Sequence, residues 1–127
     1  MKGKTLHALE LFHYFITKYR EIGYFDLHPA KTRVAFVAQI RFAGVNKIGE
    51  DFIQGAMLFD KPYFDHKCFF WIQKIPAARP GGREYFVHYF RLYKKSDLTP
   101  KLKKYMHMAY DIGLRKHIKK KPAGNTK

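Results

Sequence analysis

The chain has 127 residues, of which 46% are hydrophobic and 17% aromatic, so it contains enough apolar material for one domain with one hydrophobic core. Twenty-five Lys and Arg residues against ten Asp and Glu give a formal net charge of +15, which attracts polyanions such as nucleic acid, anionic membranes or acidic proteins. The single cysteine excludes an intramolecular disulfide, and no apolar run approaches the roughly 20 residues that span a bilayer, so we expect a cytoplasmic protein.

The first predicted element is an amphipathic helix over residues 6–22. Its apolar residues recur at spacings of three and four, which places them on one face of the helix. They are Leu9, Phe12, Phe15, Ile16, Tyr19 and Ile22. Thr5 can cap the start of this helix, and Gly23 can adopt the left-handed conformation that commonly ends one.

Strand patterns follow the helix after a predicted turn at residues 27–29. Residues 32–45 alternate, which places Phe36 and Phe42 on one side and Arg33 and Arg41 on the other. This run is long for one strand, so we expect a reversal or a bulge near residues 38–39. Two further runs, 52–59 and 68–74, also have strand character, and a proline-containing segment separates them.

The last predicted strand covers residues 85–93, after a loop at residues 76–82. Alternation divides this strand into two faces. We assign Phe86, His88, Phe90 and Leu92 to the core face and Tyr85, Val87, Tyr89, Arg91 and Tyr93 to the opposite face. A hydrogen-bonded structural role is the expected one for His88, because it lies among core residues.

The chain then enters a second helix, which Thr99 caps and Pro100 begins. We predict one domain over residues 1–118 and a basic flexible tail over residues 119–127, because the tail has few apolar residues. Since parallel strands need long crossovers, the element order predicts an α+β fold. In this fold an antiparallel meander sheet of four to five strands packs against an N-terminal and a C-terminal helix.

Four short segments carry a resemblance to known domains: Lys31-Thr32-Arg33-Val34-Ala35-Phe36, Arg41-Phe42-Ala43-Gly44-Val45, His88-Tyr89-Phe90-Arg91-Leu92 and Ala109-Tyr110-Asp111-Ile112-Gly113. Together they resemble an uncharacterised bacterial family, a domain of unknown function, over about residues 6–117. The chain is more distantly similar to MmcQ/YjbR-type domains. That resemblance implies a curved antiparallel sheet with flanking helices and a DNA-binding-like label, and it implies no catalytic residue.

Residues suited to catalysis or metal binding form no recognised pattern. His66 and Cys68, with Asp60 and Asp65 nearby, have no zinc-site spacing, so we expect no metal ion and no cofactor. The acidic residues are scattered, whereas a metal-dependent nuclease needs clustered carboxylates. Ser96, the sole serine, adjoins the predicted cap of the second helix. We therefore expect a binding protein rather than an enzyme, although an enzyme with an unrecognised site stays open.

A nucleic-acid-binding surface is the preferred hypothesis, with another polyanion as the wider class of partner. Arginines beside tyrosines on the non-core strand faces can hold phosphates and stack on bases, although they can equally do no more than cover the sheet. Basic side chains of the second helix and tail can hold phosphates or serve only as a solvated helix end. The candidate residues are Arg33, Arg41, Tyr85, Tyr89, Arg91, Lys103, Lys104, Arg115, Lys116, Lys119, Lys120 and Lys121.

Two functions therefore compete. The first is a non-catalytic module that binds nucleic acid with little sequence preference. The alternative is a small-ligand or protein-interaction domain, with a polar pocket on the sheet and a charge that serves solubility alone. Phosphate contacts make binding sensitive to salt, whereas a ligand in a pocket tolerates salt, so the two functions differ in a measurable property.

Overall fold

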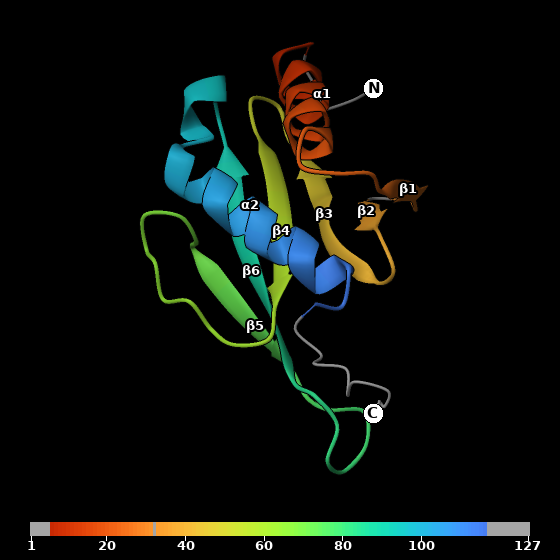
Figure 1. The fold of residues 1–127 in the computed structure, drawn as a ribbon. Helices are drawn as coiled ribbons and strands as arrows, with labels where there is room; N and C mark the ends of the chain where they lie inside the picture. The colour runs from red at the N-terminus through yellow and green to blue at the C-terminus, as the bar shows by residue number, and fades with distance from the viewer. Residues whose placement is uncertain (1–5, 32, 117–127) are drawn as a thin grey trace.

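A computed structural model describes residues 6–31 and 33–116, which form two α-helices, one short 3₁₀ helix and one six-stranded sheet (Figure 1). The elements are α1 (Leu6–Arg20), β1 (Asp26–Pro29), β2 (Val34–Val37), β3 (Arg41–Ile48), β4 (Ile53–Phe59), β5 (Trp71–Ile75), β6 (Tyr85–Leu92), η1 (Lys95–Asp97) and α2 (Pro100–Gly113). The predicted α+β class is confirmed.

The sheet is antiparallel throughout, with the strand order β1-β2-β3-β4-β6-β5. The first four strands form a meander, whereas β5 lies at the edge and pairs only with β6. The prediction of four to five strands was wrong, because residues 26–29 pair with β2 from Asp26↔Val37 to Pro29↔Val34. Their sequence resembles a turn, and only this pairing makes them a strand.

Both helices lie on the same face of the sheet. In Figure 1 α2 crosses the sheet, and both α1 and α2 contact β3 and β4. Side chains of β4 alternate strictly between buried and half-buried positions, which is the pattern of a sheet with one covered face. No described helix covers the other face, which we call the open face. No helix among the described residues is long and apolar enough to cross a membrane.

An aromatic core fills the space between the helices and the sheet. Phe36 and Phe90 are almost fully buried, and the Phe15 ring lies 5.7 Å from the first and 5.4 Å from the second. The Tyr19 hydroxyl is also buried, and it donates a 2.7 Å hydrogen bond to the Met106 carbonyl of α2. Of the four core positions predicted on β6, His88, Phe90 and Leu92 are buried, whereas Phe86 is only half-buried.

Local predictions differ in their outcome. The chain does reverse between β2 and β3, where the backbone N–H groups of Gln39 and Ile40 donate to the Gly113 carbonyl at the end of α2. Thr99 does cap α2, because its hydroxyl accepts from the Leu102 N–H at 3.1 Å. The strand predicted from residue 68 begins only at Trp71, because a loop that packs against α2 precedes it.

Candidate functional site

One row of paired residues crosses the open face through five strands. Ala35 pairs with Gly44, Gly44 with Ala56, Ala56 with Tyr89, and Tyr89 with Trp71. Residues that are paired in this way project to the same side of a sheet. Ala35, Gly44 and Ala56 have a very small side chain or none, so the surface is recessed over these three residues. The aromatic rings of Tyr89 and Trp71 lie at one end of the recessed part.

A hollow of about 390 Å³ lies over the three small residues. A Cβ atom added to Gly44 would lie 2.7 Å from the Val34 carbonyl oxygen, so the residue at the centre of the floor has to be glycine. The other lining is mixed: Val87 and Leu58 are apolar, and the polar groups come from Arg33, Arg41, Asn46, Gln73, Tyr85 and Tyr89. The hollow lies on the sheet, where the alternative function places a polar pocket, but its floor is apolar.

The charge of this hollow is entirely positive. Arg33 and Arg41 line it, and no aspartate or glutamate does. Neither guanidinium has a hydrogen bond or ion pair with any described residue, and both arginines are exposed. Two unpaired guanidinium groups at an acid-free hollow favour an anionic ligand, because each offers five N–H donors with fixed geometry.

A continuous chain of ring contacts runs beside the hollow. The rings of Trp71 and Tyr89 are stacked, with centroids 4.9 Å apart and an angle of 16° between their planes. Phe70 lies 6.4 Å from Tyr89, and the Arg91 guanidinium lies 4.6 Å from the centre of the Phe70 ring. The same guanidinium is 5.3 Å from Phe52, over which Lys47 also lies. We call this set the aromatic row: Lys47, Phe52, Arg91, Phe70, Tyr89 and Trp71.

The aromatic row is both exposed and held in place. Trp71 is 54% exposed and Phe70 is 50% exposed, which is unusual for large apolar rings. The Tyr89 hydroxyl donates to Gln73 Oε1 at 2.8 Å, and Arg91 Nε donates to Gln54 Oε1 at 2.9 Å. Hydrogen bonds to the sheet therefore hold the polar groups of Tyr89 and Arg91, while about half of the Trp71 and Phe70 side chains is open to solvent.

The structure separates the predicted site residues into two groups. Arg33, Arg41, Tyr85 and Tyr89 come together around the hollow, and Arg91 lies next to them in the aromatic row. They share one face because they alternate away from the helix-covered core. The five residues thus form one candidate interface.

The basic residues of the second helix do not join this interface. Lys103 and Lys104 belong to α2 and line a separate groove beside Lys18 of α1, on the face of the sheet that the helices cover. Arg115 and Lys116 follow α2, and the Lys116 ammonium lies 3.6 Å from the Asp111 carboxylate. The remaining predicted residues, Lys119, Lys120 and Lys121, lie outside the described residues, as does the whole of the predicted tail, residues 119–127.

Four members of the aromatic row were not predicted as site residues: Lys47, Phe52, Phe70 and Trp71. Trp71 is the only tryptophan of the chain, and it lies in a run with strand character. Its exposure depends on β5 being an edge strand, which the sequence pattern does not indicate. Phe70 and Phe52 come close only through Arg91, so no spacing along the chain could have linked them.

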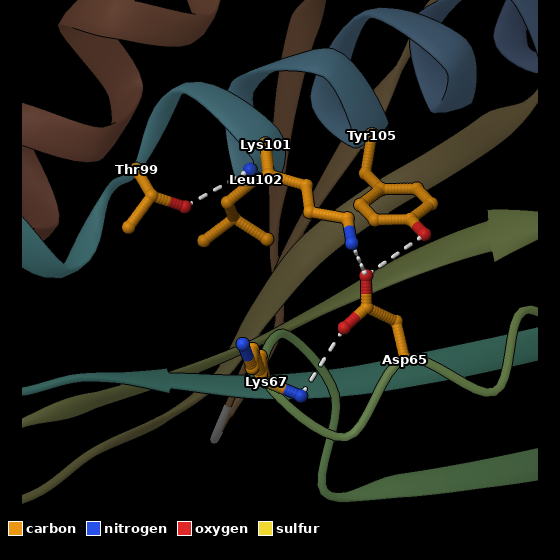
Figure 2. Close-up of polar contacts among 6 residues, drawn as sticks. All are labelled: Asp65, Lys67, Thr99, Lys101, Leu102 and Tyr105. Atoms are coloured by element: carbon orange, nitrogen blue, oxygen red, sulfur yellow. Dashed lines mark hydrogen bonds and ion pairs between the residues drawn. The ribbon is translucent and has the colours of Figure 1, made fainter.

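A second polar cluster joins the loop before β5 to α2 (Figure 2). Lys101 Nζ lies 2.8 Å from Asp65 Oδ2, the Tyr105 hydroxyl donates to the same oxygen at 3.2 Å, and the Lys67 N–H donates to Oδ1. The hydrogen bond from Lys101 lowers the pKa of the Asp65 carboxyl. Burial raises the pKa of the neighbouring Cys68 thiol, which keeps it protonated and a poor nucleophile. The cluster therefore has a structural role, because it holds the loop before β5 against α2.

The buried histidine is also fully used by the fold. The Tyr63 N–H donates to His88 Nε2 at 2.9 Å, so the proton of the neutral ring is on Nδ1, which donates to the Phe86 carbonyl at 3.0 Å. Burial lowers the pKa of His88. Among the described residues no group of three or more His, Cys, Asp or Glu side chains is placed to hold a metal ion.

Comparison of the chain with protein-family models, curated proteins and solved structures finds no significant match. The resemblance to a domain of unknown function and to MmcQ/YjbR-type domains therefore stays a prediction.

Proposed function

We propose that the chain is a non-catalytic nucleic-acid-binding protein, and that single strands bind across its open face. The observation that carries this proposal is the half-exposed Trp71 ring stacked on Tyr89, in contact through Phe70 with Arg91. Aromatic rings beside guanidinium groups on an open sheet are suited to stacking with unpaired bases and to pairing with phosphates.

The aromatic row favours single strands over duplexes. In a duplex the bases stack on one another, so only their edges and the phosphates reach a protein surface. Rings such as Trp71 and Phe70 instead offer faces, which suit the faces of unpaired bases. Stacking also tolerates any base, so this chemistry fits a protein with little sequence preference.

The electrostatics of the open face support the same function. Arg33, Arg41 and Arg91 all lie on this face, and the chain as a whole has a net charge of +15. Such a field attracts a polyanion over a distance of about 10 Å at 0.1 M salt. The lysines of α2 face the other side of the molecule, so the strand that we propose does not contact them.

A second candidate function rests on the hollow alone. A small anionic molecule could occupy it without any nucleic acid, because about 390 Å³ falls within the range of ligand pockets. The aromatic row outside the hollow has no role in that function. Binding of a small anion would also fall less steeply with salt than binding of a polyanion, because it releases few condensed counterions.

The proposed function is tested by the fluorescence anisotropy of a dye-labelled thymidine oligonucleotide titrated with the protein. We expect Trp71→Ala to weaken binding about tenfold, in line with the loss of one stacked base. Phe64→Ala is the matched control, since Phe64 is 74% exposed but lies outside the aromatic row. Equal affinities for the two variants would contradict the proposal, provided that thermal melts show both to be folded.

A further inference from the structure

We infer that the hollow of the open face holds one nucleotide of the bound strand, with its base over the floor and its flanking phosphates at Arg33 and Arg41. This inference rests on the proposed function. It makes the hollow a specific nucleotide subsite, whereas the aromatic row stacks with neighbouring bases.

The size and floor of the hollow suit a single planar group. Its volume of about 390 Å³ lies near the lower end of the roughly 300–1,000 Å³ that ligand pockets usually have. Ala35, Gly44 and Ala56 form a floor without protruding side chains, so a flat ring can approach the sheet backbone closely. The neighbouring Val87 and Leu58 are apolar and exclude water from such a ring.

The positions of the two arginines suit the two phosphates that flank one nucleotide. Arg33 immediately precedes β2, and Arg41 pairs with Val37, the last residue of that strand. Arg33 and Val37 are four residue steps apart, which is about 13 Å at the usual rise per residue of a strand. The Ala35–Gly44 pair lies between these ends. The backbones of the two arginines therefore lie toward opposite ends of the floor. Successive phosphates of a strand lie closer together than this, and the long, flexible arginine side chains allow both guanidinium groups to reach them.

The hollow is also continuous with the aromatic row. Tyr89 lines the hollow and at the same time stacks against Trp71. A strand that places one base in the hollow thus has its next base beside the exposed tryptophan. This continuity favours a nucleotide within a strand over a free small anion as the occupant.

The test uses a ten-nucleotide strand of abasic sugars with one central thymine, and the same strand without the thymine. Both have the same phosphates, so the difference in affinity reports on one base. We expect the thymine to improve binding to the unmodified protein about tenfold. Ala56→Ile fills the floor with a residue that suits a strand, and it should abolish this advantage. The control Ala77→Ile lies outside the hollow and should keep it.

The outcomes separate the inference from the proposed function. If the thymine advantage survives in Ala56→Ile and is lost only in Trp71→Ala, the base stacks on the aromatic row alone and the inference is wrong. If the unmodified protein fails to bind even an all-thymidine strand, the proposed function itself is wrong.

A second pair of variants keeps the inference testable if Ala56→Ile does not fold. Arg33→Gln with Arg41→Gln removes both charges at the hollow, whereas Arg79→Gln with Arg83→Gln removes two charges from the loop before β6. We expect the first pair to weaken binding of the thymine strand at least tenfold more than the second. If both double variants weakened binding of the thymine strand equally, the affinity would depend only on the total charge of the protein, and the inference would be wrong.

Discussion

Trp71 stacks almost parallel on Tyr89 across the β5–β6 pair, on the face of the sheet opposite the two helices. The Tyr89 hydroxyl is anchored to Gln73, so this pair is ordered before any ligand binds. Ordering a side chain on binding commonly costs about 0.5–1.5 kcal/mol, and a pair that is already ordered avoids part of that cost. The open face therefore has a preformed surface for stacking, whereas the lysines on α2 offer charge alone.

The salt dependence of binding should identify the face that contacts phosphates. Each lost phosphate contact lowers the slope of log K against log salt by about 0.7 for a single strand. We expect Arg91→Gln to lower the slope by about this amount and Lys103→Gln to leave it unchanged, because Lys103 lies on the helix side. Isothermal titration at several salt concentrations measures both slopes. A larger effect from Lys103 would place the strand on α2 instead.

The aromatic core should dominate the stability of the fold. Phe36→Ala and Phe90→Ala should each lower the free energy of unfolding by about 3–5 kcal/mol, because each leaves a cavity among buried rings. Phe64→Ala, at an exposed position, should cost well below 1 kcal/mol. Urea denaturation monitored by circular dichroism measures all three. Near-native stability of the Phe36 or Phe90 variant would contradict the assignment of the core face.

His88 should make the fold sensitive to mild acid. Burial lowers the pKa of His88 in the folded protein. Below about pH 6.5 the unfolded chain therefore binds a proton that the folded protein does not, and the free energy of unfolding decreases as the pH is lowered. Protonation of Nε2 would also break the bond from the Tyr63 N–H.

The measurement is the urea midpoint at pH 7.5 and at pH 5.5. We expect a clear decrease for the unmodified protein and a smaller one for His88→Gln. The control His66→Gln replaces an exposed histidine and should retain the full decrease. If His88→Gln loses as much stability as the control between these pH values, burial of the neutral ring is not the cause.

Much of the fold follows from periodicity in the sequence. Alternation placed Phe36 and Phe90 in the core correctly, and the Thr99-Pro100 pair marked the start of α2. The three-to-four spacing in α1 identified the helix and its buried Phe15, but it missed Ala8 and Leu11, which are almost fully buried, and chose Leu9 and Phe12, which are half-buried. Apolar residues are so frequent in this segment that their spacing alone does not show which of them face the core.

The candidate site was predictable only in part. Alternation put Arg33, Arg41 and Tyr89 on one face, and the structure brings them together. The hollow itself depends on three small residues meeting in register across β2, β3 and β4, and the sheet has register shifts on both sides of β3. Strand pairing of this kind is a property of the folded sheet, so no local pattern in the sequence reveals it.

The fluorescence of Trp71 provides the most direct test of the open face as a binding surface for single strands. Trp71 is the only tryptophan of the chain and is half exposed in the aromatic row, so its emission reports on that surface alone. At about 50 mM salt, where phosphate contacts are strong, titration with a thymidine oligonucleotide should quench the emission to a saturating level, and Tyr89→Ala should weaken this binding about tenfold. Unchanged emission throughout the titration would contradict the proposal that a single strand lies across this face.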